Sequence, residues 1–415
     1  MGKPLCSFDD IARSFAPGDH LFLPGCGSEA CDLVTALHGV EQLQITTTFV
    51  PGINPTPIDD FAASTRVTGL FMTPALSAPQ ARGQYRHLPL SYAGFARYAQ
   101  DNFTPDAIAL TVSEPNAQGM VSLGTSVEFS ALVLARAPRK IAVINPNMPY
   151  VATSHCLPLS TFDTIARSDT PLRTYDVGPR QPEAEQIATH LAGLIPDGAA
   201  LQVGLGKVPD ALFAQLHDRK GLRLHSGMFS DGVIGLNGAG ALSPDWPHMT
   251  CALIGSPALY DWAGRQDQIS VTGCEHTHDP ARIAAIDGFI TVNTALEVDL
   301  FGQCNLETAN GRAVSSPGGA PDFARAGRMS HGGLSIVALP SSFAKGTQSR
   351  ITAAIHAPGL VSLARYDIDM IITEHGIADL RKGSTHDRAE AIINIAAPAF
   401  RADLTEQWNV IKNRL

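Results

Sequence analysis

The chain has 415 residues, a length that predicts two to three domains with room for sizeable cores. Acidic residues outnumber basic ones, 39 against 30, and the formal charge of −9 argues against a nucleic-acid partner, whose binding depends on clustered Lys and Arg. No apolar run approaches the roughly 18 residues of a membrane span, so no membrane partner is expected. A charged fraction of only 17%, together with 37 Gly and 29 Pro, indicates buried sheet and many ordered turns.

The seven cysteines are an odd number, are widely scattered and lack a CxxC spacing, so a disulfide framework is not expected. The first residues show no long apolar stretch typical of a signal peptide, and Cys6 stands where a myristoylation signal needs Ser or Thr. We therefore expect a cytoplasmic α/β enzyme.

Helix-like and strand-like segments alternate in the first half of the chain. Residues 8–14 are predicted to be helical, 20–23 extended, 30–37 helical and 43–50 extended. This alternation is typical of βαβ units and a largely parallel sheet.

A polar, Pro-containing segment from Thr170 to Pro182 is the predicted linker between domains. A second α/β series follows it, beginning with a predicted helix at 183–195 that has one apolar face. We predict an N-terminal domain at 1–180 and a C-terminal domain at 181–415.

The second series resembles the first at an offset near 180 residues. GDHLFLPGCG from Gly18 corresponds to GAALQVGLG from Gly198, and the strand from Leu43 corresponds to that from Leu222. Each half therefore predicts a strand, a Gly-x-Gly turn and a helix. We infer two similar α/β domains related by a pseudo-two-fold, with the site in a cleft between their strand ends.

The turn from Gly25 to Ala30 fits the G-x-G-x-x-A form of a dinucleotide fingerprint. The next strand ends in Thr and Phe rather than in the acid that would hold a ribose, so NAD binding is not favoured. A close-packed turn, or an anion site at a helix N-terminus, remains open for this segment. Glu29 is either an exposed first-turn acid or a catalytic one.

Cys274-Glu-His276-Thr-His278-Asp279 collects potential zinc ligands in a short segment, but no distant residues can be identified that complete a site. We expect no bound metal. The Gly318-Gly319 pair exposes backbone amides that suit a thioester carbonyl or a pantetheine arm, although a tight structural turn explains it equally.

At these residues the chain resembles the acetyl-CoA hydrolase/transferase family, nearest the 4-hydroxybutyrate CoA-transferase branch. The resemblance extends over nearly the whole chain, through VSEPNAQG from Val112, LQVGLGKVPDA from Leu201, HSGMFSDG from His225, VNTALEVD from Val292, PGGAPDF from Pro317 and ITEHGIADL from Ile372. It implies two α/β domains of the CoA-transferase (NagB/RpiA-like) type, with acyl-CoA as substrate and no tightly bound cofactor.

The family implies a ping-pong exchange in which a glutamate attacks an acyl-CoA thioester, passes through an anhydride to a glutamyl-CoA thioester, and gives CoA to a carboxylate. The resemblance places Asn293 beside the reacting groups. It also assigns coenzyme A binding to Gln202, Gly204, Gly206, Met228, Gly318, Gly319 and Pro321.

The family's glutamate position is occupied here by Gly227, which has no side chain that could attack a thioester. Four accounts follow. Another acid serves as the nucleophile, with Glu29 as the leading candidate and Glu114 and Glu297 behind it; or the space at Gly227 admits water or a second substrate. Alternatively, the site cleaves a carbon–carbon bond of a β-keto acyl-CoA, or the protein binds acyl-CoA without turnover.

We therefore predict a CoA-transferase-like enzyme acting on a short-chain or dicarboxylic acyl-CoA such as acetyl-, succinyl-, 4-hydroxybutyryl- or itaconyl-CoA. An acyl-CoA hydrolase is the alternative, and a non-catalytic binder is a third. The expected partners are acyl-CoA, small carboxylates and further copies of the chain in a homo-oligomer.

Overall fold

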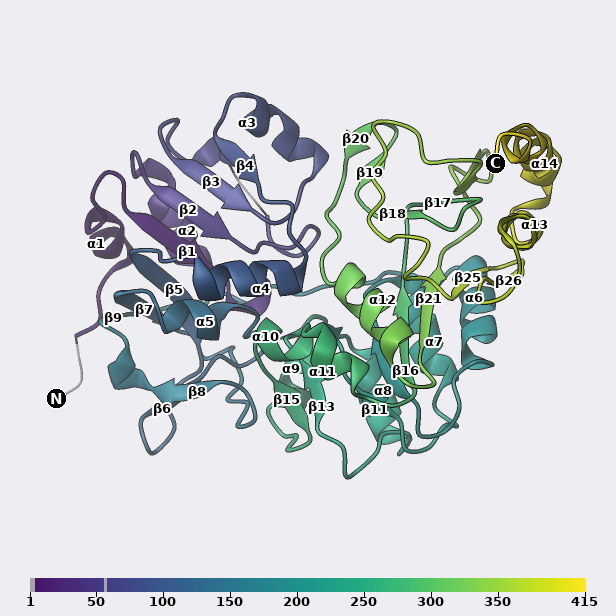
Figure 1. Cartoon of the computed structure of the whole chain (residues 1–415). Coiled ribbons are helices and arrows are strands. Elements are labelled where there is room, and N and C mark those ends of the chain that lie inside the picture. The colour runs from purple at the N-terminus through teal and green to yellow at the C-terminus, as the bar shows by residue number, and fades with distance from the viewer. Residues whose placement is uncertain (1–3, 56–57) are drawn as a thin grey trace. The chain divides into compact units, whose positions relative to one another are not determined.

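The computed structural model describes residues 4–55 and 58–415, whose contacts divide into two compact units (Figure 1). Unit 1 consists of Met1–Asp176, Gly227–Asp231 and Pro247–Thr277; unit 2 consists of Val177–Ser226, Gly232–Trp246 and His278–Leu415. The change from unit 1 to unit 2 at Asp176 falls in a stretch without helix or strand, from Ser168 to Gln181, where the sequence predicts the linker. Two segments of the second half of the sequence thus belong to unit 1.

Unit 1 is built on a seven-stranded sheet in the order β4-β3-β2-β1-β5-β7-β9, and every neighbouring pair in it is parallel. The strands are β1 (His20–Leu23), β2 (Gln44–Thr47), β3 (Arg66–Gly69), β4 (Tyr85–His87), β5 (Ala107–Val112), β7 (Arg139–Ile144) and β9 (Thr164–Arg167). Its helices are α1 (Phe8–Arg13), α2 (Cys31–Ala36), α3 (Ser77–Ala81), α4 (Tyr92–Asp101), α5 (Ser130–Leu134), α9 (Pro257–Ala263) and α10 (Cys274–Thr277).

Short strands extend unit 1 beyond this sheet. They form the pairs β6 (Met120–Ser122) with β8 (Cys156–Pro158), β12 (Met228–Phe229) with β14 (Ala252–Leu253), and β13 (His248–Thr250) with β15 (Ile269–Val271). The pair β12–β14 is formed by the segments that the second half of the sequence contributes to this unit.

Unit 2 contains a six-stranded sheet in the order β11-β10-β16-β21-β25-β26, parallel except for its edge strand β26. The strands are β10 (Ala200–Val203), β11 (Arg223–Leu224), β16 (Phe289–Asn293), β21 (Leu334–Ala338), β25 (Met370–Thr373) and β26 (Gly376–Asp379). The helices are α6 (Pro182–Ala192), α7 (Lys207–Gln215), α8 (Gly232–Gly238), α11 (Pro280–Ala284), α12 (Ala320–Met329), α13 (Thr385–Asn394) and α14 (Pro398–Lys412).

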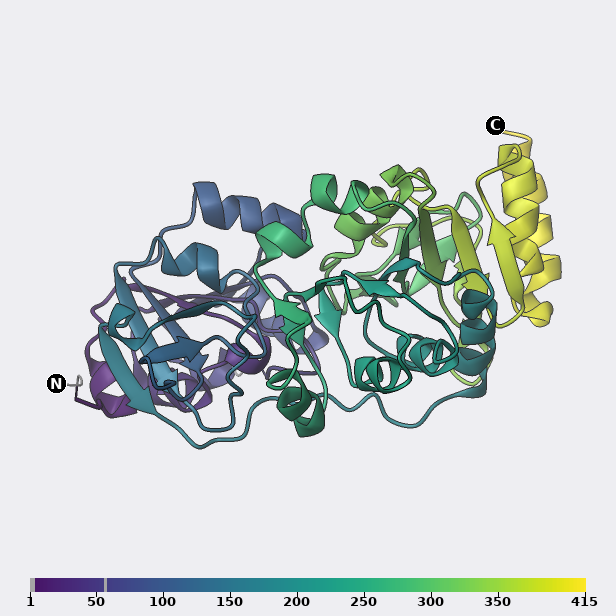
Figure 2. The ribbon, with the colours of Figure 1, turned by 90° about the horizontal axis from the view of Figure 1, so that it is seen from below.

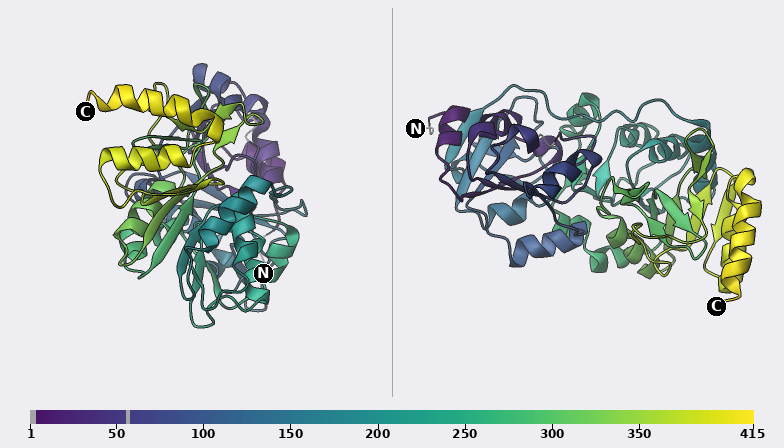
Figure 3. Two further views of the ribbon diagram at one scale, coloured as in Figure 1. Left: turned by 90° about the vertical axis from the view of Figure 1, so that its right-hand side faces the viewer. Right: turned by 90° about the horizontal axis from the view of Figure 1, so that it is seen from above.

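Helices pack on both faces of the unit 2 sheet. α6 and α7 pack against each other (Figure 2), and α12 packs on β16 and β21. At the C-terminal end α13 and α14 lie side by side (Figure 3), where Ile392 and Trp408 join the core formed with Val337 and Ile371. The short strands of this unit are β17 (Glu297–Asp299), β18 (Cys304–Asn305), β19 (Thr308–Ala309), β20 (Arg312–Ala313), β22 (Ser342–Phe343), β23 (Gln348–Ser349) and β24 (Ile351–Thr352).

The predicted duplication is confirmed by strand order. The run β2-β1-β5-β7-β9 of unit 1 and the run β11-β10-β16-β21-β25 of unit 2 follow the same path through their sheets, and each is parallel throughout. In both units the second strand of the run lies on one side of the first strand, and the later strands lie on its other side. This reversal creates a switch point between β1 and β5 in unit 1 and between β10 and β16 in unit 2. Ligands of open α/β sheets bind beside the carboxyl ends of the strands at such a point.

The predicted helices and strands of the first 50 residues are confirmed as α1, β1, α2 and β2. Between β1 and α2 the structure adds a 3-10 turn at Cys26–Ser28 that is packed without spare room. A Cβ atom at Gly25 would lie 2.4 Å from the Thr48 carbonyl oxygen, and one at Gly27 would lie 2.2 Å from Thr125 Oγ1. The structure therefore contains the close-packed turn that the sequence left open, and an anion site at this turn stays a prediction.

We predict that Gly25→Ala destabilises the protein by about 1–3 kcal/mol, because the added methyl group meets backbone rather than the end of a flexible side chain. Gly39→Ala is the matched control, since nothing lies within 4 Å of a Cβ atom there. Thermal melting of the two variants checks the prediction. Equal melting temperatures would contradict the close packing of this turn.

Candidate functional site

The switch point of unit 2 carries a buried polar network on one face of two adjacent strands. Gln202 of β10 stands opposite Thr291 of β16, and Asn293 ends the same strand. Thr291 Oγ1 donates to Gln202 Oε1 at 2.6 Å, while Asn293 Nδ2 donates to Thr291 Oγ1 at 2.7 Å. Gln202 Nε2 donates in turn to Asn293 Oδ1 at 3.4 Å. The structure therefore brings the predicted residues Gln202 and Asn293 together, through a threonine that the sequence analysis missed.

The corresponding pair in unit 1 is apolar. At the offset of 180 residues Gln202 corresponds to Phe22, whose partner across the strand pair is Ile108, and both are fully buried. Burying amide and hydroxyl groups costs free energy that only hydrogen bonds offset. The repeat therefore shows that an apolar pair also fits this position, so the polar pair of unit 2 is not needed for the strand order.

The turn after β10 leads directly into α7 through Gly204 and Gly206. Gly206 is the N-cap of α7 and has a φ of +121°, a conformation that side chains other than hydrogen rarely allow. No side chain caps the first turn of this nine-residue helix, and nothing lies within 4 Å of a Cβ atom at either glycine. These features suit the approach of an anionic ligand to the backbone.

The predicted Gly318-Gly319 turn forms the start of α12. Gly318 has a φ of +57°, Gly319 is the N-cap, and Pro321 lies in the first turn, which has no side-chain cap. A Cβ atom at Gly319 would lie 2.4 Å from the imidazole of His278, so close approach requires glycine here. Burial together with the nearby His225 lowers the pKa of His278 to about 3, which keeps its imidazole neutral.

Glu29 follows the 3-10 turn at the switch point of unit 1, and its side chain is only 2% exposed. The idea that it is an exposed first-turn acid is wrong. Arg173 donates to both carboxylate oxygens, from Nε at 2.6 Å and from Nη2 at 2.9 Å, and Asn54 Nδ2 donates to one of them at 2.7 Å. Glu29 is thus held in a fixed position by a bidentate ion pair.

Asn54 and Arg173, the two partners of the Glu29 carboxylate, were not predicted from the sequence. Asn54 donates to the Cys26 carbonyl at 3.1 Å and accepts from the Cys26 N–H at 2.8 Å, so it fastens the turn to the next loop. The backbone carbonyl of Arg173 accepts from the Tyr260 hydroxyl at 2.6 Å, which ties this part of the chain to α9. Both residues lie in irregular segments with no periodic pattern that could have identified them.

A second buried carboxyl in unit 1 belongs to Glu128, which is 1% exposed. It accepts hydrogen bonds from Thr48 and Tyr92 hydroxyls, each at 3.3 Å, and from the Cys26 thiol at 3.7 Å. None of the described residues forms a salt bridge with it. Burial away from any cation raises its pKa to about 7. The signal available in the sequence was that Glu128 is the only charged residue between Met120 and Leu134.

Glu128 and Gly227 are both hydrogen-bonded to Cys251, which lies between β13 and β14. The Gly227 carbonyl accepts from the Cys251 N–H at 3.2 Å and from its Sγ at 2.8 Å, while the Cys251 carbonyl accepts from the Glu128 N–H at 3.3 Å. Glu128 and Cys26 both have positive φ values, +42° and +52°. Left-handed backbone at non-glycine residues stores strain and is concentrated at functional sites.

Of the other predicted residues, Glu114 and Glu297 lie apart from these groups, whereas Met228 follows Gly227 and the Cys274 N–H donates to the Glu128 carbonyl at 2.8 Å. Glu114 forms a surface ion pair with Arg167, and Glu297 begins β17 and accepts from Asn305 Nδ2 at 3.2 Å. Met228 lies on β12 opposite Ala252. Of the potential zinc ligands, Cys274 is buried with its Sγ within 4.8 Å of Cys251 Sγ in unit 1, whereas His278 opens a segment of unit 2.

Comparison with known proteins gives two family models that match most of the chain. The acetyl-CoA hydrolase/transferase N-terminal domain matches residues 2–172, and the C-terminal domain of the same family matches residues 255–408. The 4-hydroxybutyrate coenzyme A transferase of Clostridium kluyveri is 33% identical over 310 residues, which cover 73% of this chain and 72% of that protein.

Two further comparisons broaden this picture. An acetyl-CoA hydrolase of Saccharomyces cerevisiae is 24% identical over 365 residues, covering 76% of this chain and 68% of that protein. The crystal structure of RipA from Yersinia pestis matches with a TM-score of 0.91 at 28% identity, over 98% of this chain and 97% of that chain.

We predict that Glu128→Gln changes the pH dependence of stability. The unfolded carboxyl releases its proton near 4.5 and the folded one near 7, so the wild type loses up to about 3 kcal/mol of unfolding free energy as the pH rises through this window. Glutamine cannot ionise. The stability of the variant relative to the wild type should therefore rise between pH 4.5 and 7 and level off above 7.

Melting temperatures of both proteins at pH 5, 6, 7 and 8 check this expectation. Tyr92→Phe serves as a second variant, because it removes one donor to the carboxylate and leaves the ionisable group in place. A difference between Glu128→Gln and the wild type that stays constant over this range would contradict a raised pKa.

Proposed function

Because this chain belongs to the acetyl-CoA hydrolase/transferase family, we propose that it moves CoA between a short-chain or dicarboxylic acyl-CoA and a carboxylate acceptor. The observation that carries the proposal is the Gln202–Thr291–Asn293 network at the switch point of unit 2. The first turns of α7 and α12 have no side-chain cap. In the proposal, the side-chain amides of the network donate to the thioester, and the backbone N–H groups of these turns donate to phosphates. Acyl-CoA is the substrate, and the reaction requires no other bound group.

The proposed reaction is the ping-pong exchange of the family. A carboxylate attacks the thioester carbonyl and releases CoA as a thiolate, which leaves a mixed anhydride. The thiolate then attacks the enzyme's half of the anhydride, freeing the first acid and forming an enzyme thioester. The acceptor carboxylate repeats these two steps in reverse and leaves with CoA.

Glu29 is the carboxylate that we propose for the covalent step. It ends the turn at the switch point of unit 1, and the ion pair with Arg173 fixes its position. Glu128 is the second candidate, because its carboxyl has no cationic partner among the described residues and shares the neighbour Cys251 with Gly227. Glu29 has an arginine partner and Glu128 has only neutral hydrogen-bond donors, and substitution of each glutamate can show which of them is the nucleophile.

A homo-oligomer in the cytoplasm is part of the same proposal. All seven cysteines are free thiols, which fits a reducing compartment. No described helix has the length and apolar character that crossing a membrane requires.

CoA transfer predicts that an isotope-labelled carboxylate becomes a labelled acyl-CoA. Purified protein incubated with acetyl-CoA or succinyl-CoA and isotope-labelled acetate, succinate or itaconate should form a labelled acyl-CoA, detected by mass spectrometry. Release of free CoA at the same rate without an acceptor would contradict transfer and support an acyl-CoA hydrolase acting on the thioester or on a carbon–carbon bond. Stabilisation by CoA without any turnover would support the non-catalytic binder.

If Glu29 is the nucleophile, its thioester intermediate can be trapped chemically. Borohydride reduces an enzyme thioester to an alcohol, so treatment during turnover should convert residue 29 to its alcohol, as found by peptide mass spectrometry. Glu29→Gln should then reduce exchange by at least about 10³-fold, while CoA still raises the melting temperature. Label on residue 128, with loss of exchange in Glu128→Gln, would assign the step to Glu128 instead.

A further inference from the structure

The outer strands of the unit 1 sheet have one apolar face and one polar face. Along β2 and β3, Ile45 and Val67 are buried, whereas Gln44 and Arg66 are exposed. Strands of parallel sheets are ordinarily covered on both faces and are apolar on both. The polar face of β2, β3 and β4 is therefore an unusual surface for this class of sheet.

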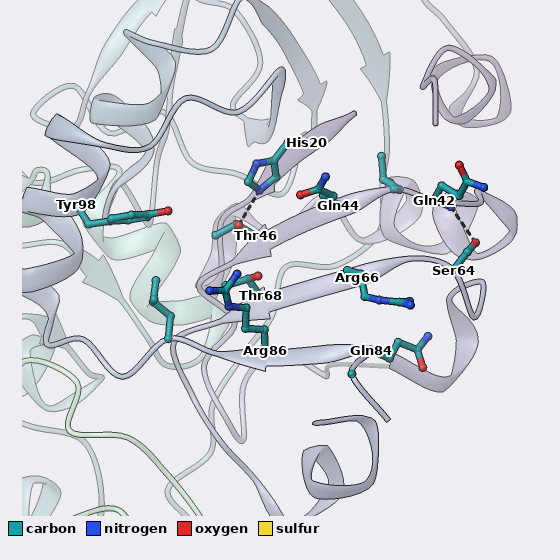
Figure 4. Close-up of a pocket in the computed structure, with 13 residues that line it drawn as sticks. His20, Gln42, Gln44, Thr46, Ser64, Arg66, Thr68, Gln84, Arg86 and Tyr98 are labelled. Atoms are coloured by element: carbon teal, nitrogen blue, oxygen red, sulfur yellow. Dashed lines mark hydrogen bonds between the residues drawn. The ribbon is translucent and has the colours of Figure 1, made fainter. Parts of the chain in front are cut away.

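This face is concave. A pocket of about 720 Å³ lies over it (Figure 4) and is bounded by the strands and by Tyr98 of α4. The lining side chains include His20, Gln44, Thr46, Thr68 and Tyr98 around Arg66 and Arg86. His20 Nε2 lies 2.8 Å from Thr46 Oγ1, so this part of the wall is already ordered by a hydrogen bond.

The charges in the pocket have one sign. Arg66 and Arg86 are its two cations, and no Asp or Glu is among the described residues that line it. Other exposed arginines of unit 1 are paired with acids, as Arg13 is with Asp10, whereas Arg136 donates to the backbone carbonyls of Gln100 and Phe103. Neither pocket arginine has an acidic partner among the described residues, although the protein as a whole carries a charge of −9.

Strand register fixes the spacing of the two arginines. Arg86 of β4 stands opposite Thr68, and Arg66 lies two residues before Thr68 on the same face of β3. One strand spacing and two residues along the strand separate their Cα atoms by roughly 8 Å. Arg66 Nη1 already donates to the Ala63 carbonyl at 2.8 Å and to the Thr65 carbonyl at 3.2 Å, which leaves its Nε and Nη2 for a ligand. Each guanidinium can thus bind one anionic group, in the bidentate geometry that carboxylates and phosphates allow.

We propose that this pocket binds a small molecule bearing two anionic groups, one at Arg66 and one at Arg86. Hydroxyl and amide donors of Thr46, Thr68 and Gln44 add hydrogen bonds to the same ligand. The pocket lies on the sheet face and includes residues that precede β1, β2 and β3 or begin them, whereas the turn that carries Glu29 follows the carboxyl end of β1. It is therefore a separate site within unit 1, whatever reaction the protein performs.

Isothermal titration calorimetry with pyrophosphate and with succinate tests the proposal, at constant ionic strength and both with and without saturating CoA. We expect saturable binding of at least one probe that is unchanged by CoA, and a loss of affinity of about tenfold or more in Arg86→Gln. Binding of pyrophosphate alone would identify a phosphate-bearing ligand, and binding of succinate alone a dicarboxylate.

Arg13→Gln is the matched control, because it removes one exposed positive charge from unit 1 outside the pocket. Arg66→Gln is a second pocket variant, and far-ultraviolet circular dichroism shows whether each variant is folded. No saturable binding, affinity unchanged in Arg86→Gln, equal weakening in Arg13→Gln, or displacement of the probe by CoA would each overturn the proposal.

Discussion

The pairing of β1 with β5 in unit 1, and of β10 with β16 in unit 2, is the constraint on which the rest of the structure depends. Each pair joins strands that are distant in sequence and parallel in space, so the chain departs in opposite directions from their carboxyl ends. This strand pairing places the reactive side chains near these ends, Glu29 in unit 1 and Asn293 in unit 2. Asn54 and Arg173, which lie in irregular segments, then fix the side chain of Glu29.

The duplication makes the differences between the units informative. One repeat fills the central strand pair with Phe22 and Ile108, and the other fills it with Gln202 and Thr291. Since both versions support the same strand order, the polar version is not required for folding. Its cost in desolvation is offset by three hydrogen bonds among Gln202, Thr291 and Asn293.

Much of this could be predicted from the sequence, because periodicity and Gly-rich turns are local signals. The first helices and strands, the linker and the repeat all follow from patterns of a few residues. The partners of Glu29 could not be predicted, because Asn54 and Arg173 are 25 and 144 residues away and lie in irregular chain. Burial of Glu128 likewise depends on Tyr92, Thr48 and Cys26, which come together only in the folded unit.

The two buried glutamates of unit 1 show how one fold can give identical side chains different chemistry. Glu29 forms a bidentate ion pair with the Arg173 guanidinium, which offsets the cost of burying a carboxylate. Glu128 has only neutral donors, so burial favours its protonated form up to a pKa of about 7. Carboxyls whose environments differ in this way can serve, respectively, as a charged nucleophile and as a proton donor or acceptor. In the proposed reaction Glu29 supplies the attacking carboxylate, so the exchange does not need a glutamate at position 227.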